Sequence, residues 1–327
     1  MTLVEVLVTE PIMGRFAEVL TREGSSPHHW TFAFGDDPAL SAAASTAEVL
    51  VCSSAPAALL GSMPRLRLVH VTGAGFDKVA MDALPPGVQV ANTFHHGRSI
   101  AEHVLMVTMM LRRHVLRSDR EMRAGVWSNV IVDSGHPFGG VVAGSSLGVI
   151  GLGEIGATVA RTASALGMRV RAVRRNPAAA PPPGVTLDWV GGEADLPELL
   201  ATSDVVVVTV PLDESTRGLI DATALARMRP DALLINVSRG AVVDEQALHD
   251  ALTRGTIAGA GLDVWWRNPR DADRPPPSTL DFSHFDNVVL TPHQSGHTEE
   301  VFAGRARDIT DNVDALASGQ PLRNVVR

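Results

Sequence analysis

The sequence contains a single cysteine, no tyrosine and no excess of positive charge. Because Cys52 has no second cysteine to pair with, an internal disulfide is impossible, and we expect a reduced, cytoplasmic setting. The formal net charge of −8 argues against nucleic acid and against an anionic membrane as partners. No apolar run reaches the length of a membrane span, and we expect no signal peptide. Without tyrosine, one familiar class of general acid is excluded.

The residues that are present indicate a globular chain with two domains. Of its 327 residues, 45% are hydrophobic and 20% charged, as in globular proteins. A chain of this length is too long for one hydrophobic core and suits two domains. Short apolar runs alternate with helical patterns, which predicts an α/β fold with two doubly wound parallel sheets. The expected strands are 4–8, 49–52, 66–71, 88–91, 147–150, 168–173, 204–210, 232–237, 257–262 and 288–291. The expected helices include 13–20, 157–166, 194–201, 221–228, 244–254 and 298–317.

Three glycines follow the apolar run at 147–150 and precede a helical segment. Gly151 permits a tight strand-to-helix turn, Gly153 lets a backbone approach a pyrophosphate, and Gly156 lets the helix pack closely on the strand. The pyrophosphate would accept from free N–H groups at the helix N-terminus, where the helix dipole favours negative charge. The strand, glycines, helix and second strand come in the required order. We therefore predict a Rossmann-type dinucleotide site that includes Glu154 and Ile155.

The strand after this helix ends in two arginines. A chain that prefers NAD carries an acidic residue there, whose carboxylate accepts from the ribose 2′-hydroxyl. Here Arg174 stands at that place, and Arg175 follows it. Two guanidiniums can bind a 2′-phosphate through charge-assisted hydrogen bonds, with Asn176 as a possible third contact. The sequence predicts NADP(H) in preference to NAD(H); the alternative is that one or both arginines point into solvent.

Other segments mark boundaries. Ser99 and Glu102 have the spacing of a capping box at the start of a long apolar helix, which we expect to cross from the first domain to the second and to end among the basic residues 112–117. The proline-rich segments 176–184 and 267–279 are expected to be loops, the second a candidate substrate-facing loop. The turn at 72–77 lies after a strand, where open α/β sheets bind ligands, although a plain turn is the alternative.

Seven motifs in order make the chain similar to the D-isomer-specific 2-hydroxyacid dehydrogenase family. They are TGAGFD at 72–77, SIAEH at 99–103, GLGEIG at 151–156, VPLDESTR at 210–217, INVSRG at 235–240, GLDV at 261–264 and TPH at 291–293. The resemblance implies a flavodoxin-like substrate domain of residues 1–98 and 299–327. It also implies an inserted dinucleotide-binding domain of residues 99–298, and a homodimer built mainly on that inserted domain.

The resemblance also implies roles for individual residues. Arg239 matches the arginine that grips the substrate carboxylate, and His293 matches the histidine that exchanges a proton with the 2-oxygen. Ala74 and Gly75 match a loop whose N–H groups help to hold the carboxylate. Asp263 matches the residue that orients the nicotinamide carboxamide. The remaining cofactor-binding positions implied by the motifs are Val210, Pro211, Thr216, Val237, Ser238, His293 and Gly296. The sequence predicts no metal site.

One position departs from the family pattern. Most relatives carry a glutamate that pairs with the histidine, whereas counting along this chain reaches Asn268, which we take as a member of the catalytic set. An amide cannot stabilise an imidazolium by charge. Asp271 or Asp273 is a possible displaced acid.

The first interpretation of the function is the reversible reduction of a small 2-oxo acid, of the glyoxylate or hydroxypyruvate kind. The alternatives are oxidation of a small anion such as formate or phosphite, and a nucleotide-sensing scaffold without activity.

Overall fold

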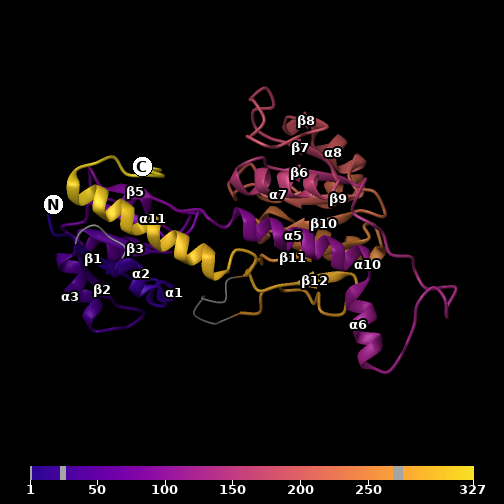
Figure 1. Ribbon diagram of the computed structural model, residues 1–327, viewed down its shortest axis with the longest axis horizontal. Helices are drawn as coiled ribbons and strands as arrows, with labels where there is room; N and C mark the ends of the chain where they lie inside the picture. Colours follow the sequence, from indigo (N-terminus) through magenta and orange to yellow (C-terminus); the bar gives the residue numbers. More distant parts are fainter. Residues whose placement is uncertain (1, 23–26, 268–274) are drawn as a thin grey trace. The chain divides into compact units, whose positions relative to one another are not determined.

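The computed structural model describes residues 2–22, 27–267 and 275–327, and the chain divides into two compact units (Figure 1). The split unit comprises Met1–His95 and His297–Arg327, and the continuous unit comprises His96–Gly296. Among the described residues, neighbouring strands within each sheet pair in parallel. The prediction of two parallel-sheet α/β domains is therefore confirmed.

The described strands of the split unit form one sheet in the order β2-β1-β3-β4-β5, which is the flavodoxin-like order. Helices α1, α2 and α11 pack on one face of this sheet, and α3 and α4 pack on the other. Its strands are β1 (Glu5–Val8), β2 (His29–Phe32), β3 (Val49–Cys52), β4 (Leu68–Val71) and β5 (Gln89–Ala91). Its helices are α1 (Pro11–Gly14), α2 (Ala17–Arg22), α3 (Ala39–Thr46), α4 (Ala57–Gly61), the 3₁₀ turn η1 (Met81–Ala83) and α11 (Glu299–Ser318).

The described strands of the continuous unit form a second sheet in the order β12-β11-β10-β9-β6-β7-β8, so the strand order reverses between β6 and β9. This is the Rossmann order with one further strand. The strands are β6 (Ser146–Ile150), β7 (Arg169–Val173), β8 (Trp189–Gly191), β9 (Val205–Val208), β10 (Leu233–Asn236), β11 (Gly259–Leu262) and β12 (Val288–Leu290). The helices are α5 (Gly97–Arg112), α6 (Val115–Arg123), α7 (Glu154–Ala165), α8 (Leu196–Thr202), α9 (Ala222–Arg227) and α10 (Glu245–Arg254), with 3₁₀ turns η2 (Glu193–Asp195) and η3 (Gly240–Val242).

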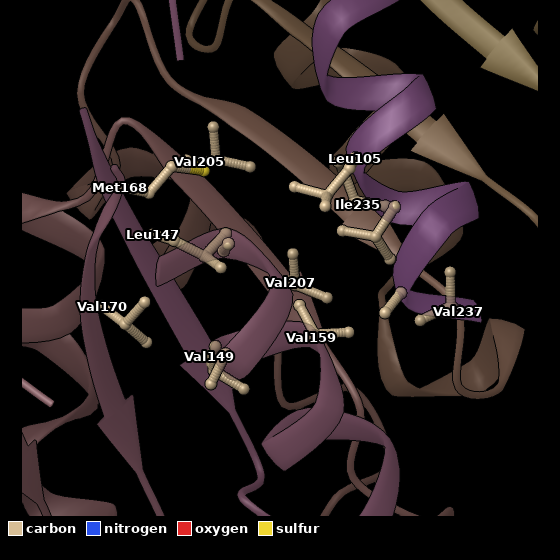
Figure 2. Packing of buried hydrophobic residues seen from close by; sticks show 14 of the residues in the cluster. Leu105, Leu147, Val149, Val159, Met168, Val170, Val205, Val207, Ile235 and Val237 are labelled. Atoms are coloured by element: carbon tan, nitrogen blue, oxygen red, sulfur yellow. The ribbon is translucent and has the colours of Figure 1, made fainter. Parts of the chain in front are cut away.

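Both faces of this second sheet are covered. Figure 2 shows Val149 of β6, Val207 of β9 and Ile235 of β10 on the face that meets Leu105 of α5 and Val159 of α7. Helices α8, α9 and α10 pack on the opposite face. The continuous valine run of β9 is fully buried, as a strand with two covered faces requires. This two-sided packing fixes the strand ends, from which the turns of the candidate site emerge.

The predicted capping box is wrong. Helix α5 begins at Gly97, and the Ser99 hydroxyl donates to the carbonyl of Ser295 at 2.6 Å instead of capping the helix. Glu102 accepts from Arg98 at 2.9 Å. The helix begins earlier because it packs directly on α7: a Cβ added at Gly97 would lie only 2.3 Å from Glu154 Oε1. This tertiary contact outweighs the local capping pattern.

Three further elements differ from the prediction. Residues 13–20 form parts of two short helices, α1 and α2, instead of one. The long helix stops at Arg112 because His114 adopts a left-handed conformation with φ 52°, and α6 starts directly afterwards. Strands β2 and β8 are new; β2 is only partly buried, so it lacks the uninterrupted apolar run on which the strand predictions depended.

Candidate active site

Most of the predicted site residues lie at one edge of the seven-stranded sheet. Because the strands are parallel, the chain leaves β6, β7, β9, β10, β11 and β12 at the same carboxyl edge. Three turns there are named by their residues: the glycine turn (151–156) after β6, the arginine turn (236–240) at the end of β10 and the histidine turn (291–296) after β12. The structure thus brings together, within the continuous unit, motifs that are far apart in the sequence.

The glycine turn is formed by close main-chain contacts. Gly151 has a φ of 94°, a left-handed conformation that favours glycine. A Cβ added at Gly156 would lie 2.0 Å from the Gly151 carbonyl oxygen, so the start of α7 touches the end of β6 directly. A Cβ added at Gly153, by contrast, would meet nothing within 4 Å. Gly153 is also the N-cap of α7 and offers no side chain to the first turn of that helix. These features fit a bound pyrophosphate.

Sequence reasoning missed Thr209, which follows β9. Its hydroxyl lies 2.6 Å from the carbonyl oxygen of Gly151 and 3.1 Å from that of Ile150, and it can donate to one of them. It therefore ties β9 to the glycine turn at the point where the strand order reverses. A polar residue at the end of a valine run is the only local sign of this role. Of the other predicted residues here, Ile155 packs against the core, and Val210 lies against Gly151.

The segment 210–217 closes on itself beside the glycine turn. The Thr216 hydroxyl donates to the Pro211 carbonyl at 2.7 Å and accepts from the Asp213 backbone N–H at 2.8 Å. Hydrogen bonds from the Ser215 hydroxyl and from the backbone N–H groups of 215 and 216 lower the pKa of Asp213. The predicted cofactor residues Pro211 and Thr216 thus shape one compact loop after β9.

The two arginines after β7 differ in their surroundings. The Arg174 guanidinium donates to the backbone carbonyls of Pro177, Ala179 and Ala180, so it orders the loop that follows. The Arg175 side chain is 89% exposed and lies 3.8 Å from Asp213. Arg174 is therefore engaged with the protein's own backbone, whereas Arg175 presents its charge to solvent. Asn176 is exposed, and its backbone carbonyl accepts from the Ala179 N–H.

The arginine turn is stabilised by the buried Asn236. The Asn236 amide donates to the Arg239 carbonyl at 3.0 Å, and its oxygen is 3.1 Å from both the N–H and the hydroxyl of Ser238. Arg239 itself has extended backbone angles, and its Nη1 donates to the Ser238 carbonyl at 2.8 Å. Val237 is buried in the core beneath. The turn is therefore rigid at its base, and Arg239 extends from it.

The histidine turn is held by Asp263, whose side chain is almost fully buried. One carboxylate oxygen accepts from the Thr291 hydroxyl at 2.6 Å and from the Gln294 N–H at 2.9 Å, and the other accepts from the Ser295 N–H at 3.0 Å. His293 has a left-handed φ of 56°, which is rare for a residue with a Cβ. One carboxylate therefore accepts three hydrogen bonds that support a strained turn.

Two other contacts complete this turn. His103 on α5 was not predicted as a site residue; its Nε2 lies 3.4 Å from the Thr291 hydroxyl. Burial lowers the pKa of His103, and the nearby Asp263 carboxylate opposes that shift. At the other end of the turn, a Cβ added at Gly296 would come within 3.2 Å of the His96 Cβ, so this predicted glycine permits close packing.

Ala74 and Gly75 belong to the split unit, where they follow β4. The Asn92 amide donates to the Ala74 carbonyl at 2.7 Å, which fixes this loop from β5. The Asn92 oxygen is buried and has no hydrogen-bond partner among the described residues. Asn268, Asp271 and Asp273 lie outside the described residues.

No group of three or more His, Cys, Asp or Glu side chains in the described ranges is arranged to hold a metal ion. None of the helices described above combines the length and the apolar character that crossing a membrane demands.

Comparison with known proteins identifies related chains. The family model for the D-isomer specific 2-hydroxyacid dehydrogenase NAD binding domain matches residues 105–295. The chain is 34% identical to the glycerate dehydrogenase of Methylorubrum extorquens, with 86% of this chain and 85% of the relative covered. It is 37% identical to glyoxylate/hydroxypyruvate reductase B of Pectobacterium carotovorum, with 89% and 88% covered.

Two solved structures extend this similarity to the fold. The D-lactate dehydrogenase of Aquifex aeolicus, complexed with NAD and lactic acid, has a TM-score of 0.79 at 26% identity and 96% coverage of both chains. A D-isomer specific 2-hydroxyacid dehydrogenase from Xanthobacter autotrophicus Py2, in complex with NADPH and MES, has a TM-score of 0.79 at 28% identity. That comparison covers 100% of this chain and 98% of the other.

Proposed function

Because the chain belongs to the D-isomer specific 2-hydroxyacid dehydrogenase family, we propose that it reduces a small 2-oxo acid of the glyoxylate or hydroxypyruvate kind. It is an NAD(P)-dependent oxidoreductase that acts on 2-hydroxy acids. The observation that carries the substrate proposal is that hydrogen bonds hold the two turns from which Arg239 and His293 extend. Both residues extend from rigid turns at one sheet edge, and the turn that bears His293 is anchored on a buried carboxylate.

Each of these residues has a distinct part in the reaction. The Arg239 guanidinium binds the substrate carboxylate through paired hydrogen bonds and polarises the adjacent carbonyl. An imidazole nitrogen of His293 gives a proton to the 2-oxygen during reduction and removes it during oxidation. The nicotinamide, when bound, supplies or accepts the hydride. Gly153 and the N-terminus of α7 would hold the pyrophosphate.

Alanine variants test these roles. With glyoxylate or hydroxypyruvate and reduced cofactor, Arg239→Ala should raise KM about 100-fold, since it loses a bidentate charged contact. His293→Ala should lower kcat by about 100-fold or more while the cofactor Kd stays unchanged. Near wild-type kinetics in both variants would refute the roles. Wild-type oxidation of formate or phosphite without turnover of any 2-oxo acid would favour the small-anion alternative. Cofactor binding without any turnover would favour the scaffold.

The preference for NADP(H) is also a proposal. It is supported by the place of Arg174 and Arg175 after β7, and the exposed Arg175 is the better candidate for a direct contact with the 2′-phosphate. Arg174 would act by ordering the loop. Arg175→Asp should lower kcat/KM for NADPH by about 10- to 100-fold and leave that for NADH within a few-fold, because one charge-assisted contact is lost. Equal or better wild-type efficiency with NADH would contradict the preference.

We propose that a second copy of this chain covers the arm formed by residues 115–141. Figure 1 shows α6 and the segment after it extending away from the seven-stranded sheet. No residue of α6 is buried, and Trp127, Ile131 and Phe138 are 74%, 87% and 83% exposed. Exposed apolar surface of this kind marks an interaction site. A sedimentation measurement should find a dimer that Ile131→Asp weakens; a monomeric wild type would refute the proposal.

The cytoplasmic location stays a prediction. Its basis is the lone Cys52, which the structure buries at the end of β3. Burial raises the pKa of this thiol to about 12, so it is protonated and unreactive at neutral pH.

A further inference from the structure

Trp265, two residues after Asp263, contacts both the arginine turn and the histidine turn. Its main chain lies against Gly240, and its indole Nε1 donates to the Thr291 carbonyl at 2.9 Å. It therefore links two segments that are separated by about fifty residues in the sequence. All of these residues belong to the continuous unit.

The contact with the arginine turn is made by backbone. A Cβ added at Gly240 would lie 2.3 Å from both the carbonyl carbon and the carbonyl oxygen of Trp265, and 2.7 Å from the nitrogen of Trp266. Real Cβ atoms do not approach other atoms so closely. Glycine at 240 thus allows the chain after β11 to lie directly on the residue that follows Arg239. The backbone of Trp265 therefore helps to set the position of Arg239.

The contact with the histidine turn is made by the side chain. The Thr291 carbonyl accepts from the indole of Trp265 and also from the N–H of His293, at 2.9 and 3.1 Å. The second bond closes a three-residue turn around Pro292, whose ring fixes its own φ. His293 follows in its left-handed conformation. The hydrogen bond that Trp265 donates to the Thr291 carbonyl therefore restrains the start of this turn. The backbone of the turn sets the orientation of His293.

We propose that Trp265 is a positioning residue that holds His293 in register with Arg239. The inference rests on the proposed function, in which the arginine binds the carboxylate while the histidine exchanges a proton with the neighbouring 2-oxygen. The carboxylate and the 2-oxygen of the substrate are a fixed distance apart. The Arg239 and His293 side chains must therefore be held at a matching distance. Asp263 anchors the histidine turn to β11. Trp265 adds the link to the arginine turn.

The alternative role for Trp265 is as a wall of a pocket. It lines a cavity together with Leu290 and the segment 276–283. A wall residue would change the KM for the substrate when it is replaced. A positioning residue would change kcat instead, because the misplaced histidine affects the proton transfer more than the binding.

Trp266 provides a matched control. Its indole also donates to a backbone carbonyl, that of Val243, at 2.8 Å, but this bond does not reach the histidine turn. Its ring stacks on Phe282 at 5.6 Å. Trp265→Phe and Trp266→Phe each remove one indole-to-carbonyl bond of nearly equal length and keep an aromatic ring. The two variants should therefore lose similar stability, which urea unfolding measures.

The kinetic expectation separates the two. Trp265→Phe should lower kcat about 10- to 100-fold, because displacements of about 1 Å cost this much in rate. Its KM values for 2-oxo acid and cofactor should stay within about twofold of the wild type, as should all constants of Trp266→Phe. Equal kcat losses in both variants, an unchanged kcat in Trp265→Phe, or a loss confined to KM would each overturn the positioning role.

His293→Ala distinguishes this failure from failure of the proposed function. If His293→Ala is inactive while Trp265→Phe keeps its kcat, only the positioning role is wrong. If His293→Ala itself keeps the wild-type kcat, the proposed function and the positioning role both fall.

Discussion

The glycine turn and the histidine turn lie at the same edge of the seven-stranded sheet, yet they are held in opposite ways. In the glycine turn, main chain meets main chain: Gly156 approaches the Gly151 carbonyl so closely that a Cβ would lie 2.0 Å from it. In the histidine turn, side chains from other segments bind the backbone. Asp263 accepts from the Gln294 and Ser295 N–H groups and from the Thr291 hydroxyl, and Ser99 and Trp265 each donate one hydrogen bond to carbonyls of the turn.

This difference suits what each turn must do. A pyrophosphate is bound by backbone N–H groups, so the glycine turn needs a fixed backbone shape and open space at Gly153. An acid–base group needs one side chain in one orientation, which a turn can maintain only if its strain is compensated elsewhere. The buried carboxylate of Asp263 provides that compensation for the left-handed His293.

The largest effect is expected when the glycine turn receives a side chain. Gly156→Ala should destabilise the protein by at least about 3 kcal/mol, because the added Cβ overlaps a backbone oxygen that cannot move away. Gly153→Ala is the control: its Cβ meets no protein atom, so stability should stay within about 0.5 kcal/mol while cofactor affinity falls. Urea unfolding and cofactor titration measure both. Equal stability of the two variants would show that the turn is not held by main-chain contact.

A smaller effect is expected when the anchor of the histidine turn is altered. Asp263→Asn keeps the size of the side chain but places an amide donor opposite backbone N–H groups. It should cost about 2–3 kcal/mol of stability and lower kcat about 100-fold, because donors are left unpaired and His293 is displaced. Unfolding and steady-state kinetics with glyoxylate would measure these losses. A variant with full stability and full kcat would mean that the three hydrogen bonds are dispensable.

The same contrast explains how much of the molecule the sequence could predict. The glycine turn was predicted from its own residues, since the φ of Gly151 and the contact at Gly156 exclude most other side chains. The buried strands were predicted from their valine-rich runs. Pattern alone did not reveal β2, which is half-exposed, or the start of α5, which its packing on α7 decides.

The histidine turn could not be predicted in this way. Nothing near His293 in the sequence indicates that Asp263 and Trp265, some thirty residues earlier, hold its backbone. Roles for Arg239 and His293 came from the family resemblance and not from local pattern, and their assignment stays a prediction. Similarly, the sequence placed Arg174 where a chain that prefers NAD carries an acidic residue, with Arg175 directly after it. The structure separates them, because Arg174 meets carbonyls of its own loop while Arg175 is exposed.

The smallest effect should appear as a pH dependence confined to the histidine turn. Burial lowers the pKa of His103, whose Nε2 lies 3.4 Å from the Thr291 hydroxyl. The unfolded chain, with an ordinary histidine pKa of about 6.5, then binds this proton more readily than the folded one. The resulting stability is present above about pH 6.5 and is lost as the pH falls through that value toward the folded pKa. His103→Gln should lose less stability between pH 7.5 and 5 than the wild type does.

His70 in the split unit, whose pKa burial lowers to about 4, contributes with the same sign in both proteins and cancels from the comparison. Urea midpoints at the two pH values measure the difference, and parallel losses in both proteins would exclude His103 as a source of acid sensitivity.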